Sequence, residues 1–197
     1  MRIKGAIFDM DGTVVDVPYD WAKIKAELET QGKPILTYIE NLEEPERSEN
    51  WKILERFESE ATQKAKLKPG KREFLHLLSM RGVKKALVTN NSRKNVSFLL
   101  KKFNLEFDCV ISRERGLWKP SGAPILVALK ELQLNKEECF VVGDSHFDVR
   151  AAEEAGIPLI FILSEDRKRF DKMKAEVFGS VEALQTKMVK LLEKENG

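Results

Sequence analysis

Two short clusters of aspartates have types and spacing that could do chemistry. The first, Asp-Met-Asp-Gly-Thr, begins at Asp9, and the second, Gly-Asp-Ser-x-x-Asp, ends at Asp148. Asp9 and Asp11 are two residues apart, so an extended backbone directs both side chains to the same side. Asp148 follows Asp144 by four residues and returns to that side if a helix begins near Ser145. Each cluster can therefore present two carboxylates to one place.

Four carboxylates in one crevice repel one another. At an effective dielectric constant of about 20, two unit charges about 4 Å apart cost roughly 4 kcal/mol. We therefore expect a bound cation, and all-oxygen ligands with room for water favour Mg²⁺, shared with a phosphate group. Thr89 could supply a hydroxyl to the same place, and Lys119 could supply a fixed positive charge.

Each of these aspartates, taken singly, has an ordinary structural explanation. An Asp at the end of a strand is often a turn residue or a helix cap. The combination is more specific, because the motifs Asp-x-Asp-Gly-Thr, Thr, Lys-Pro and Gly-Asp-Ser-x-x-Asp occur in this order. Together they favour chemistry over capping.

Five apolar runs are expected to position these residues. They are continuous and rich in β-branched residues, which is typical of parallel strands covered on both faces. In a doubly wound sheet, ligands bind beyond the carboxyl ends of the strands, so the polar residues that end the runs should meet. The runs are Ile3 to Asp9, Lys84 to Thr89, Cys109 to Ser112, Glu138 to Asp144 and Ile157 to Leu163.

From residue 69 onward, amphipathic stretches with helix start and stop signals alternate with the apolar runs along the chain. Strands and helices that alternate in this way predict a doubly wound α/β fold. The expected helices are Pro69 to Arg81, Ser92 to Phe103, Gly122 to Leu134, Ser145 to Ala155 and Ser180 to about Lys194.

Residues 17–67 interrupt this alternation. They contain no convincing strand, and their apolar residues recur at helical spacing, so we expect a small helical insertion of about three helices. The breaks are expected near Gly32 to Pro34 and near Pro45. Trp21, Trp51 and Phe57 are expected in the core of the insertion. The predicted domains are therefore 1–16 with 68–197, and 17–67.

The composition excludes several classes of protein. The 197 residues include 34 Lys and Arg against 32 Asp and Glu, which lacks the excess of a nucleic-acid binder. No apolar run approaches the roughly 20 residues that span a bilayer, and the first residues lack the apolar centre of a signal peptide. We therefore expect a cytoplasmic protein without nucleic-acid or membrane partners. Two cysteines exclude a disulfide scaffold, and the sequence leaves the oligomeric state open.

The four motifs resemble those of the haloacid dehalogenase superfamily, in its phosphatase branch, of the phosphoglycolate phosphatase-like type. They are Asp9 to Thr13, Val88-Thr89-Asn90, Lys119-Pro120 and Gly143 to Asp148. The resemblance implies a Rossmann-like core with the five strands in the order 3-2-1-4-5. It also implies that the insertion between the first and second motifs is a helical cap.

The resemblance implies a role for each matching residue. Asp9 would be the nucleophile that forms an aspartyl-phosphate, and Asp11 would protonate the leaving oxygen and later deprotonate a water. Thr89 and backbone amides near Asp11 and Asn90 would bind phosphate oxygens. Lys119 would screen the charge between the nucleophile and the incoming dianion.

The resemblance also implies a Mg²⁺ cofactor. The ion would be held by the Asp9 carboxylate, the Asp11 main-chain carbonyl and Asp144, with Asp148 holding the metal shell. Crowding by the other carboxylates would raise the pKa of Asp11 until metal binding offsets it. His146 lies within the fourth motif, but we expect it to face solvent.

The second aspartate separates relatives within the superfamily. Haloalkanoate dehalogenases and phosphonate-cleaving members lack a residue of this kind at the position of Asp11, so the sequence argues against both reactions. Hydrolysis of a small phosphorylated metabolite is the favoured reaction. Intramolecular phosphoryl transfer, as in sugar phosphomutases, remains the first alternative, and a catalytically idle binding module remains the second.

Overall fold

The computed structural model describes residues 2–194, which fold as two compact units. Within the described residues, the larger unit consists of 2–16 and 67–194, and the smaller unit consists of Val17–Lys66.

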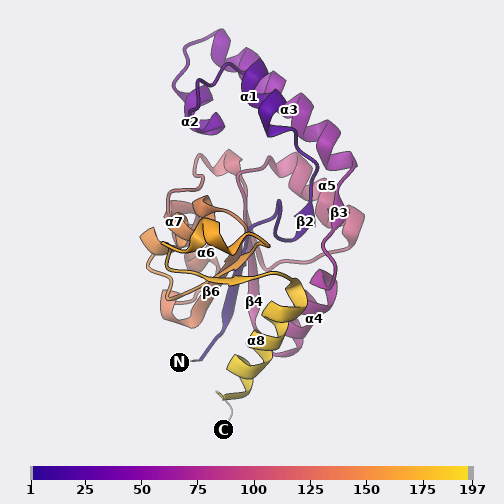
Figure 1. The fold of residues 1–197 in the computed structure, drawn as a ribbon, viewed down its shortest axis with the longest axis vertical. Coiled ribbons are helices and arrows are strands. Elements are labelled where there is room, and N and C mark those ends of the chain that lie inside the picture. The colour runs from indigo at the N-terminus through magenta and orange to yellow at the C-terminus, as the bar shows by residue number, and fades with distance from the viewer. Residues whose placement is uncertain (1, 195–197) are drawn as a thin grey trace. The chain divides into compact units, whose positions relative to one another are not determined.

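The larger unit is built on a six-stranded parallel sheet with the order β5-β4-β1-β6-β7-β8. Its first five strands are the five expected ones in the expected order, so the prediction of a doubly wound α/β fold is confirmed (Figure 1). The strands are β1 (Gly5–Phe8), β4 (Lys84–Val88), β5 (Cys109–Ile111), β6 (Cys139–Gly143), β7 (Leu159–Leu163) and β8 (Glu176–Phe178).

The sixth strand was not expected. β8 has only three residues, lies at the edge of the sheet and has exposed or half-buried side chains. It therefore lacks the continuous apolar run by which the other strands are recognised.

The helices of the larger unit lie within a few residues of their expected limits. Ser92 begins α5 by accepting a hydrogen bond from the Asn95 amide, and Asn104 ends it in the left-handed conformation. The helices are α4 (Lys71–Met80), α5 (Arg93–Phe103), α6 (Ala123–Leu132), α7 (His146–Glu154) and α8 (Val181–Lys194), with short 3-10 turns at Arg113–Arg115, Lys136–Glu138 and Arg167–Phe170.

Alternate residues of β1 face opposite layers of the core. Ile7 packs in an apolar cluster with residues of α6 and α7, whereas the Phe8 ring meets Phe74 of α4 edge to face at 5.9 Å. Figure 1 shows α6 and α7 on one side of the strands and α4 and α8 on the other. The sheet is therefore covered on both faces, as continuous apolar strands require.

The smaller unit contains three helices, α1 (Trp21–Glu27), α2 (Ile35–Glu40) and α3 (Glu46–Gln63). Its core consists of Ile24, Leu28, Ile39 and Leu54, with Trp51 and Phe57 partly buried against it. The expectation for Trp21 was wrong, because this residue is 47% exposed. The expectation of no strand was also wrong at one end, where β3 (Lys66–Leu67) pairs with β2 (Val15–Asp16). Two residues are too few to give a periodic signal.

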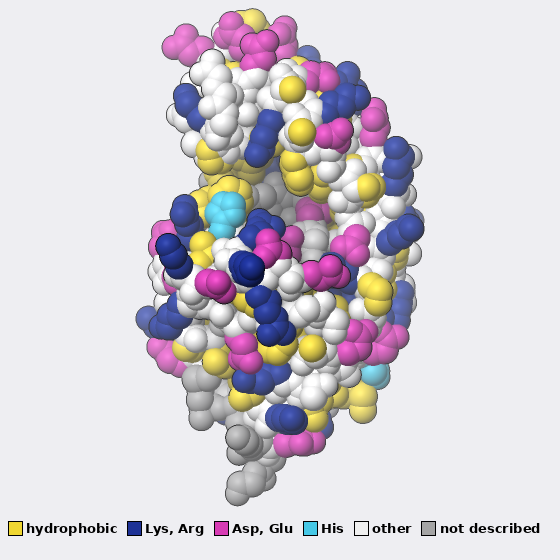
Figure 2. Space-filling view, in the orientation of Figure 1, with side chains coloured by type: hydrophobic (Ala, Val, Ile, Leu, Met, Phe, Trp, Pro, Cys, Tyr) yellow, Lys and Arg dark blue, Asp and Glu magenta, His cyan; other side chains and the backbone are white. Residues whose placement is uncertain are grey.

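The surface carries charges of both signs. On the face shown in Figure 2, Lys and Arg side chains are interspersed with Asp and Glu side chains. None of the helices within residues 2–194 combines the length and the apolar character that crossing a bilayer would need.

Candidate active site

The sheet brings the polar ends of three strands to one edge. Phe8 at the end of β1 is in register with Leu87 of β4 and Val142 of β6. Asp9 follows directly, and its backbone amide donates to the Val142 carbonyl at 2.9 Å. Thr89 and Asp144 follow β4 and β6 at the same edge. The motifs of the sequence therefore meet where a doubly wound sheet binds its ligands.

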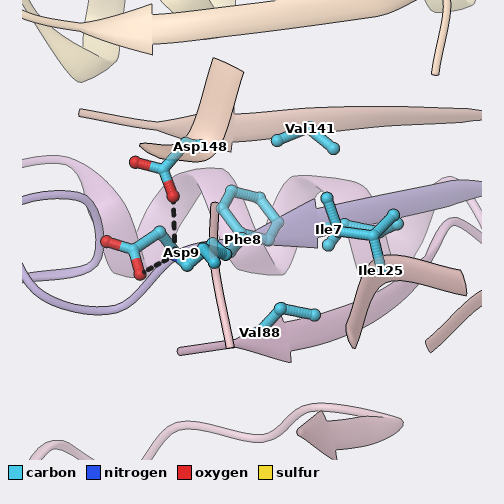
Figure 3. A pocket seen from close by; sticks show the side chains of 8 residues that line it. Ile7, Phe8, Asp9, Val88, Ile125, Val141 and Asp148 are labelled. Carbon is cyan, nitrogen blue, oxygen red and sulfur yellow. Dashed lines mark hydrogen bonds and ion pairs between the residues drawn. The ribbon is translucent and has the colours of Figure 1, made fainter. Parts of the chain in front are cut away.

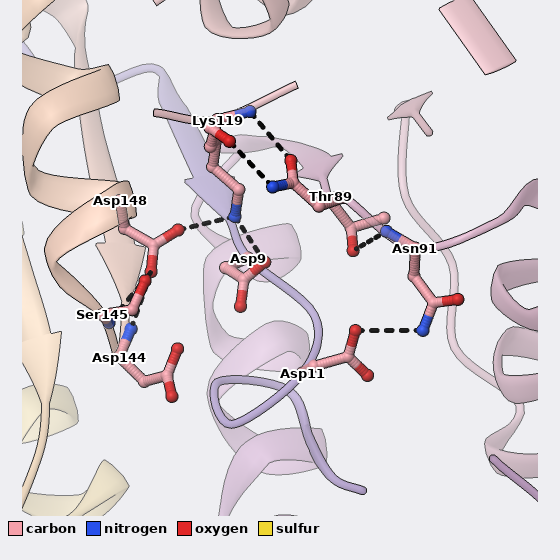
Figure 4. A network of polar contacts seen from close by, with 9 residues as sticks. Asp9, Asp11, Thr89, Asn91, Lys119, Asp144, Ser145 and Asp148 are labelled. Atoms are coloured by element: carbon pink, nitrogen blue, oxygen red, sulfur yellow. Dashed lines mark hydrogen bonds and ion pairs between the residues drawn. The ribbon is translucent and has the colours of Figure 1, made fainter. Parts of the chain in front are cut away.

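Lys119 joins two of the aspartates. Its Nζ lies 2.5 Å from Asp9 Oδ1 and 2.6 Å from Asp148 Oδ1 (Figure 4). The three residues are 6%, 9% and 1% exposed, respectively, so this bridge is shielded from water. In such surroundings, charge-assisted hydrogen bonds hold the groups in a defined geometry.

Asp148 is held by the start of its own helix. Its Oδ2 accepts hydrogen bonds from Ser145 Oγ at 2.6 Å, the Ser145 amide at 3.0 Å and the Asp144 amide at 3.2 Å. Ser145 and Asp148 form a capping box at the N-terminus of α7. Both oxygens of Asp148 are thus engaged by protein groups, and its direct effect is to orient Lys119 and this loop.

Two glycines leave room for the carboxylates. A Cβ on Gly12 would lie 2.1 Å from Asp144 Oδ2, and a Cβ on Gly143 would lie 2.3 Å from the Asp148 Cβ. Gly12 also has a φ of +83°, a conformation that side chains with a Cβ rarely adopt. Gly12 therefore allows the turn after Asp11 to approach Asp144 closely.

Asp9, Asp144 and Asp148 can each offer an oxygen so that all three atoms lie within 4.8 Å of one another. Burial, aided by the nearby aspartates, raises the pKa of Asp9 to about 7 despite Lys119, and that of Asp144 to about 8. Burial also disfavours ionised Asp148, but Lys119 and Ser145 outweigh it and hold its pKa below the usual value.

The positive charge of the site is smaller than the negative charge that its carboxylates can carry. One ammonium faces three carboxylates, and burial keeps the pKa values of Asp9 and Asp144 raised although Lys119 lowers both. Burial likewise disfavours ionised Lys119, yet Asp148 and Asp9 raise its pKa above the usual value. A hard divalent cation with oxygen ligands would supply the missing charge, so the residues present fit Mg²⁺.

The Asp11 carboxylate is not a member of this group of three. Its Oδ2 instead accepts a hydrogen bond from Asn91 Nδ2 at 3.0 Å (Figure 4). Asn91 follows Thr89, whose Oγ1 accepts from the Asn91 amide at 3.1 Å. The sequence predicted that four carboxylates meet at one place. Three of them can share a cation in the structure, whereas the fourth, Asp11, faces the end of β4.

The Asn90 side chain holds the backbone of Lys119. Its Oδ1 accepts from the Lys119 amide at 2.8 Å, and its Nδ2 donates to the Lys119 carbonyl at 2.9 Å. This double hydrogen bond fixes the backbone that carries the lysine. The sequence predicted a phosphate-binding backbone amide near Asn90, but it carried no signal for the side-chain contacts of Asn90, Asn91 and Ser145 in the site.

The space behind Asp9 is small and mostly apolar. It encloses about 10 Å³, room for at most about one water molecule. A mostly apolar lining strengthens the ion pairs beside it, because the local dielectric is low. The polar lining consists of Asp9, Lys119 and Asp148, and the apolar lining consists of Ile7, Phe8, Val88, Ile125 and Val141 (Figure 3).

The histidine of the fourth motif and the two cysteines are the remaining candidate residues. His146 is exposed and its ring contacts Phe147, as expected for a solvent-facing residue at the start of α7. Cys109 and Cys139 are free and buried on β5 and β6, and burial raises the pKa of each thiol to about 12.

The parallel sheet and the carboxylate and lysine network at its carboxyl edge define a Rossmann-like α/β enzyme. Residues 6–162 match the family model described as haloacid dehalogenase-like hydrolase, and the chain belongs to this family. The predicted family and hydrolase class are therefore confirmed.

Named relatives agree with the phosphatase branch. A phosphoglycolate phosphatase of Yersinia pestis is 30% identical, with 80% of each chain covered. A putative pyrophosphatase of Caldanaerobacter subterraneus is 28% identical, again with 80% of each chain covered. The crystal structure of a hydrolase from Pseudomonas syringae has the same fold, with a TM-score of 0.80, 18% identity and coverage of 95% of this chain and 98% of that one.

Proposed function

We propose that this protein is a Mg²⁺-dependent phosphatase that hydrolyses a small phosphorylated metabolite through an aspartyl-phosphate at Asp9. The observation that carries the proposal is the buried Asp9 carboxylate at the end of β1, 2.5 Å from Lys119 and grouped with Asp144 and Asp148. The phosphatase and pyrophosphatase names of relatives support the substrate class.

Asp9 is the nucleophile in this mechanism. Its carboxylate attacks phosphorus in line with the ester oxygen, the phosphorus to oxygen bond of the ester breaks, and the phosphoryl group remains on Asp9. Lys119 stabilises the charge between the nucleophile and the phosphoryl oxygens. The Thr89 hydroxyl and the amides after Asp11 bind those oxygens, since they lie at the same edge of the sheet.

Asp11 handles the protons. Its carboxyl group protonates the leaving oxygen, and the resulting carboxylate then removes a proton from the water that hydrolyses the aspartyl-phosphate. The two half-reactions return Asp9 and Asp11 to their starting states and release inorganic phosphate.

The proposed ligands of Mg²⁺ are all oxygen atoms. The Asp9 carboxylate, the Asp11 carbonyl and Asp144 would hold the ion, while Asp148 orients Lys119 and the loop beside them. When bound, Mg²⁺ supplies charge neutralisation for the carboxylates and the phosphate.

The helical unit, Val17–Lys66, is proposed to be a cap that selects the substrate. It is inserted between the first and second motifs, and β2 and β3 link it to the larger unit. A lid of this kind excludes water and contacts the leaving group.

Hydrolysis of p-nitrophenyl phosphate with Mg²⁺ tests the function. Turnover should be lost in Asp9→Asn and in excess chelator, and it should be retained in His146→Ala, which alters an exposed residue of the same motif. A panel containing phosphoglycolate, pyrophosphate and sugar phosphates would then identify the substrate class. Isomerised ester with little free phosphate would indicate a phosphomutase, and no turnover of any phosphoester would refute the proposal.

A further inference from the structure

Asn91 is a buried residue that the proposed mechanism does not use. It is 3% exposed and lies between β4 and α5, 80 residues along the chain from Asp11. Its Nδ2 nevertheless donates to Asp11 Oδ2 at 3.0 Å. This contact reaches the group that moves protons in the proposed function.

The orientation of the Asn91 amide is fixed by its other partners. Its Oδ1 accepts from the Ser92 amide at 2.7 Å and from Asn95 Nδ2 at 3.0 Å. A flipped amide would turn its NH₂ group toward these two donors, which an NH₂ group cannot accept. Nδ2 must therefore face Asp11, so an N–H is directed at Oδ2.

Asn95 anchors the chain of contacts in a helix. It is 5% exposed and belongs to the first turn of α5, where its own amide donates to Ser92 Oγ at 3.3 Å. The order Asn95, Asn91, Asp11 thus runs from a rigid helix end to the carboxylate. A buried and mutually satisfied polar chain of this kind holds its members in one arrangement.

We infer that Asn91 is a positioning residue for Asp11. By occupying Oδ2 as an acceptor, Asn91 keeps the Asp11 side chain in one rotamer and makes Oδ1 the oxygen that serves the leaving group. The inference rests on the proposed function, because it concerns how well Asp11 protonates the leaving oxygen.

Asn91→Asp is the sharpest variant. It keeps acceptor oxygens for Ser92 and Asn95 but replaces the donor toward Asp11 with a carboxylate. Asn135→Asp is the matched control, because it makes the same change at an exposed helix cap outside the site. Asn91→Ala removes donor and acceptors together and serves as the second variant if Asn91→Asp does not fold.

The readout is a comparison of two substrates of similar shape. Nitrophenolate leaves readily without a proton, whereas phenolate depends on general acid help, which contributes about 10²–10⁴-fold in enzymes. kcat/KM reports the steps up to departure of the leaving group. The new carboxylate repels either phosphate dianion, so both substrates are expected to lose activity, and the loss in kcat/KM with phenyl phosphate is expected to exceed that with p-nitrophenyl phosphate by about 10-fold or more.

Other outcomes would overturn the inference. An equal loss with both substrates would indicate only a structural effect or the repulsion by the new charge, and no loss with either would show that Asn91 does not position Asp11. If the wild-type protein turns over neither ester, the proposed function fails and the inference fails with it. A split between the substrates in wild-type-like folded Asn91→Asp, absent in Asn135→Asp, supports the inference.

Discussion

Lys71 places an ionisable amino group in the apolar core, and its replacement by an apolar residue should stabilise the protein. The residue is 0% exposed, and its Nζ has no hydrogen-bond partner within the described part of the chain. Two cation–π contacts partly offset the burial of this charge. Nζ lies 5.3 Å from the centre of the Phe8 ring and 5.5 Å from the centre of the Phe74 ring. Burial, aided by the charge of Lys68, lowers the pKa of Lys71 to about 7.

The size of the effect follows from the pKa shift. Lowering the pKa from 10.5 to about 7 corresponds to about 5 kcal/mol of disfavoured charge. Two desolvated cation–π contacts return about 1–2 kcal/mol each. Lys71→Met, which keeps a similar volume, is therefore expected to raise the free energy of unfolding by about 1–3 kcal/mol below pH 7.

The gain should depend on pH in a defined direction. Below about pH 7, both states of wild-type Lys71 are protonated, so the folded protein bears the full cost. Between about pH 7 and 10.5, only the unfolded chain keeps the proton, so wild-type stability rises with pH through this group. The advantage of Lys71→Met should therefore shrink across this range.

Urea unfolding of wild type and Lys71→Met at about pH 6 and about pH 9.5 measures the gain in stability and its dependence on pH. Lys94→Met, at an exposed position of α5, is the matched control and should change stability by less than about 0.5 kcal/mol at either pH. A variant that is less stable than wild type at pH 6, or that gains equally at both pH values, would refute the reasoning.

Three further predictions concern the site. Lys119→Met should lower kcat/KM for p-nitrophenyl phosphate by about 10²–10³-fold, because Asp9 and Asp148 lose their shared cation, and a loss below about 5-fold would contradict its role. Asp144→Asn should raise the Mg²⁺ concentration for half-maximal activity by about 10–100-fold, and an unchanged metal titration would exclude it as a ligand. Gly12→Ala should lower the free energy of unfolding by about 1–3 kcal/mol, measured with urea, because its φ is +83° and the new Cβ would meet Asp144; wild-type stability would disprove the close approach.

The strands and helices of the larger unit could be predicted because their signals are local. A buried parallel strand such as β6 is a continuous apolar run, and a helix such as α5 begins at Ser92 and ends at Asn104. β8 and β3 escaped prediction because two or three residues carry no period. Trp21 was misplaced because an apolar residue type does not by itself indicate which face of a helix is covered.

The sequence by itself determined the chemical groups, since Asp9, Asp11, Lys119 and the fourth motif lie at the ends of recognisable strands or beside helices. Only the tertiary structure decided which of them touch. The Asn90 clamp on Lys119 joins residues 29 positions apart, and the Asn91 contact with Asp11 joins residues 80 positions apart. Spacing along one chain cannot reveal such pairs, because hydrogen bonds depend on distances between atoms that only the packed sheet brings together.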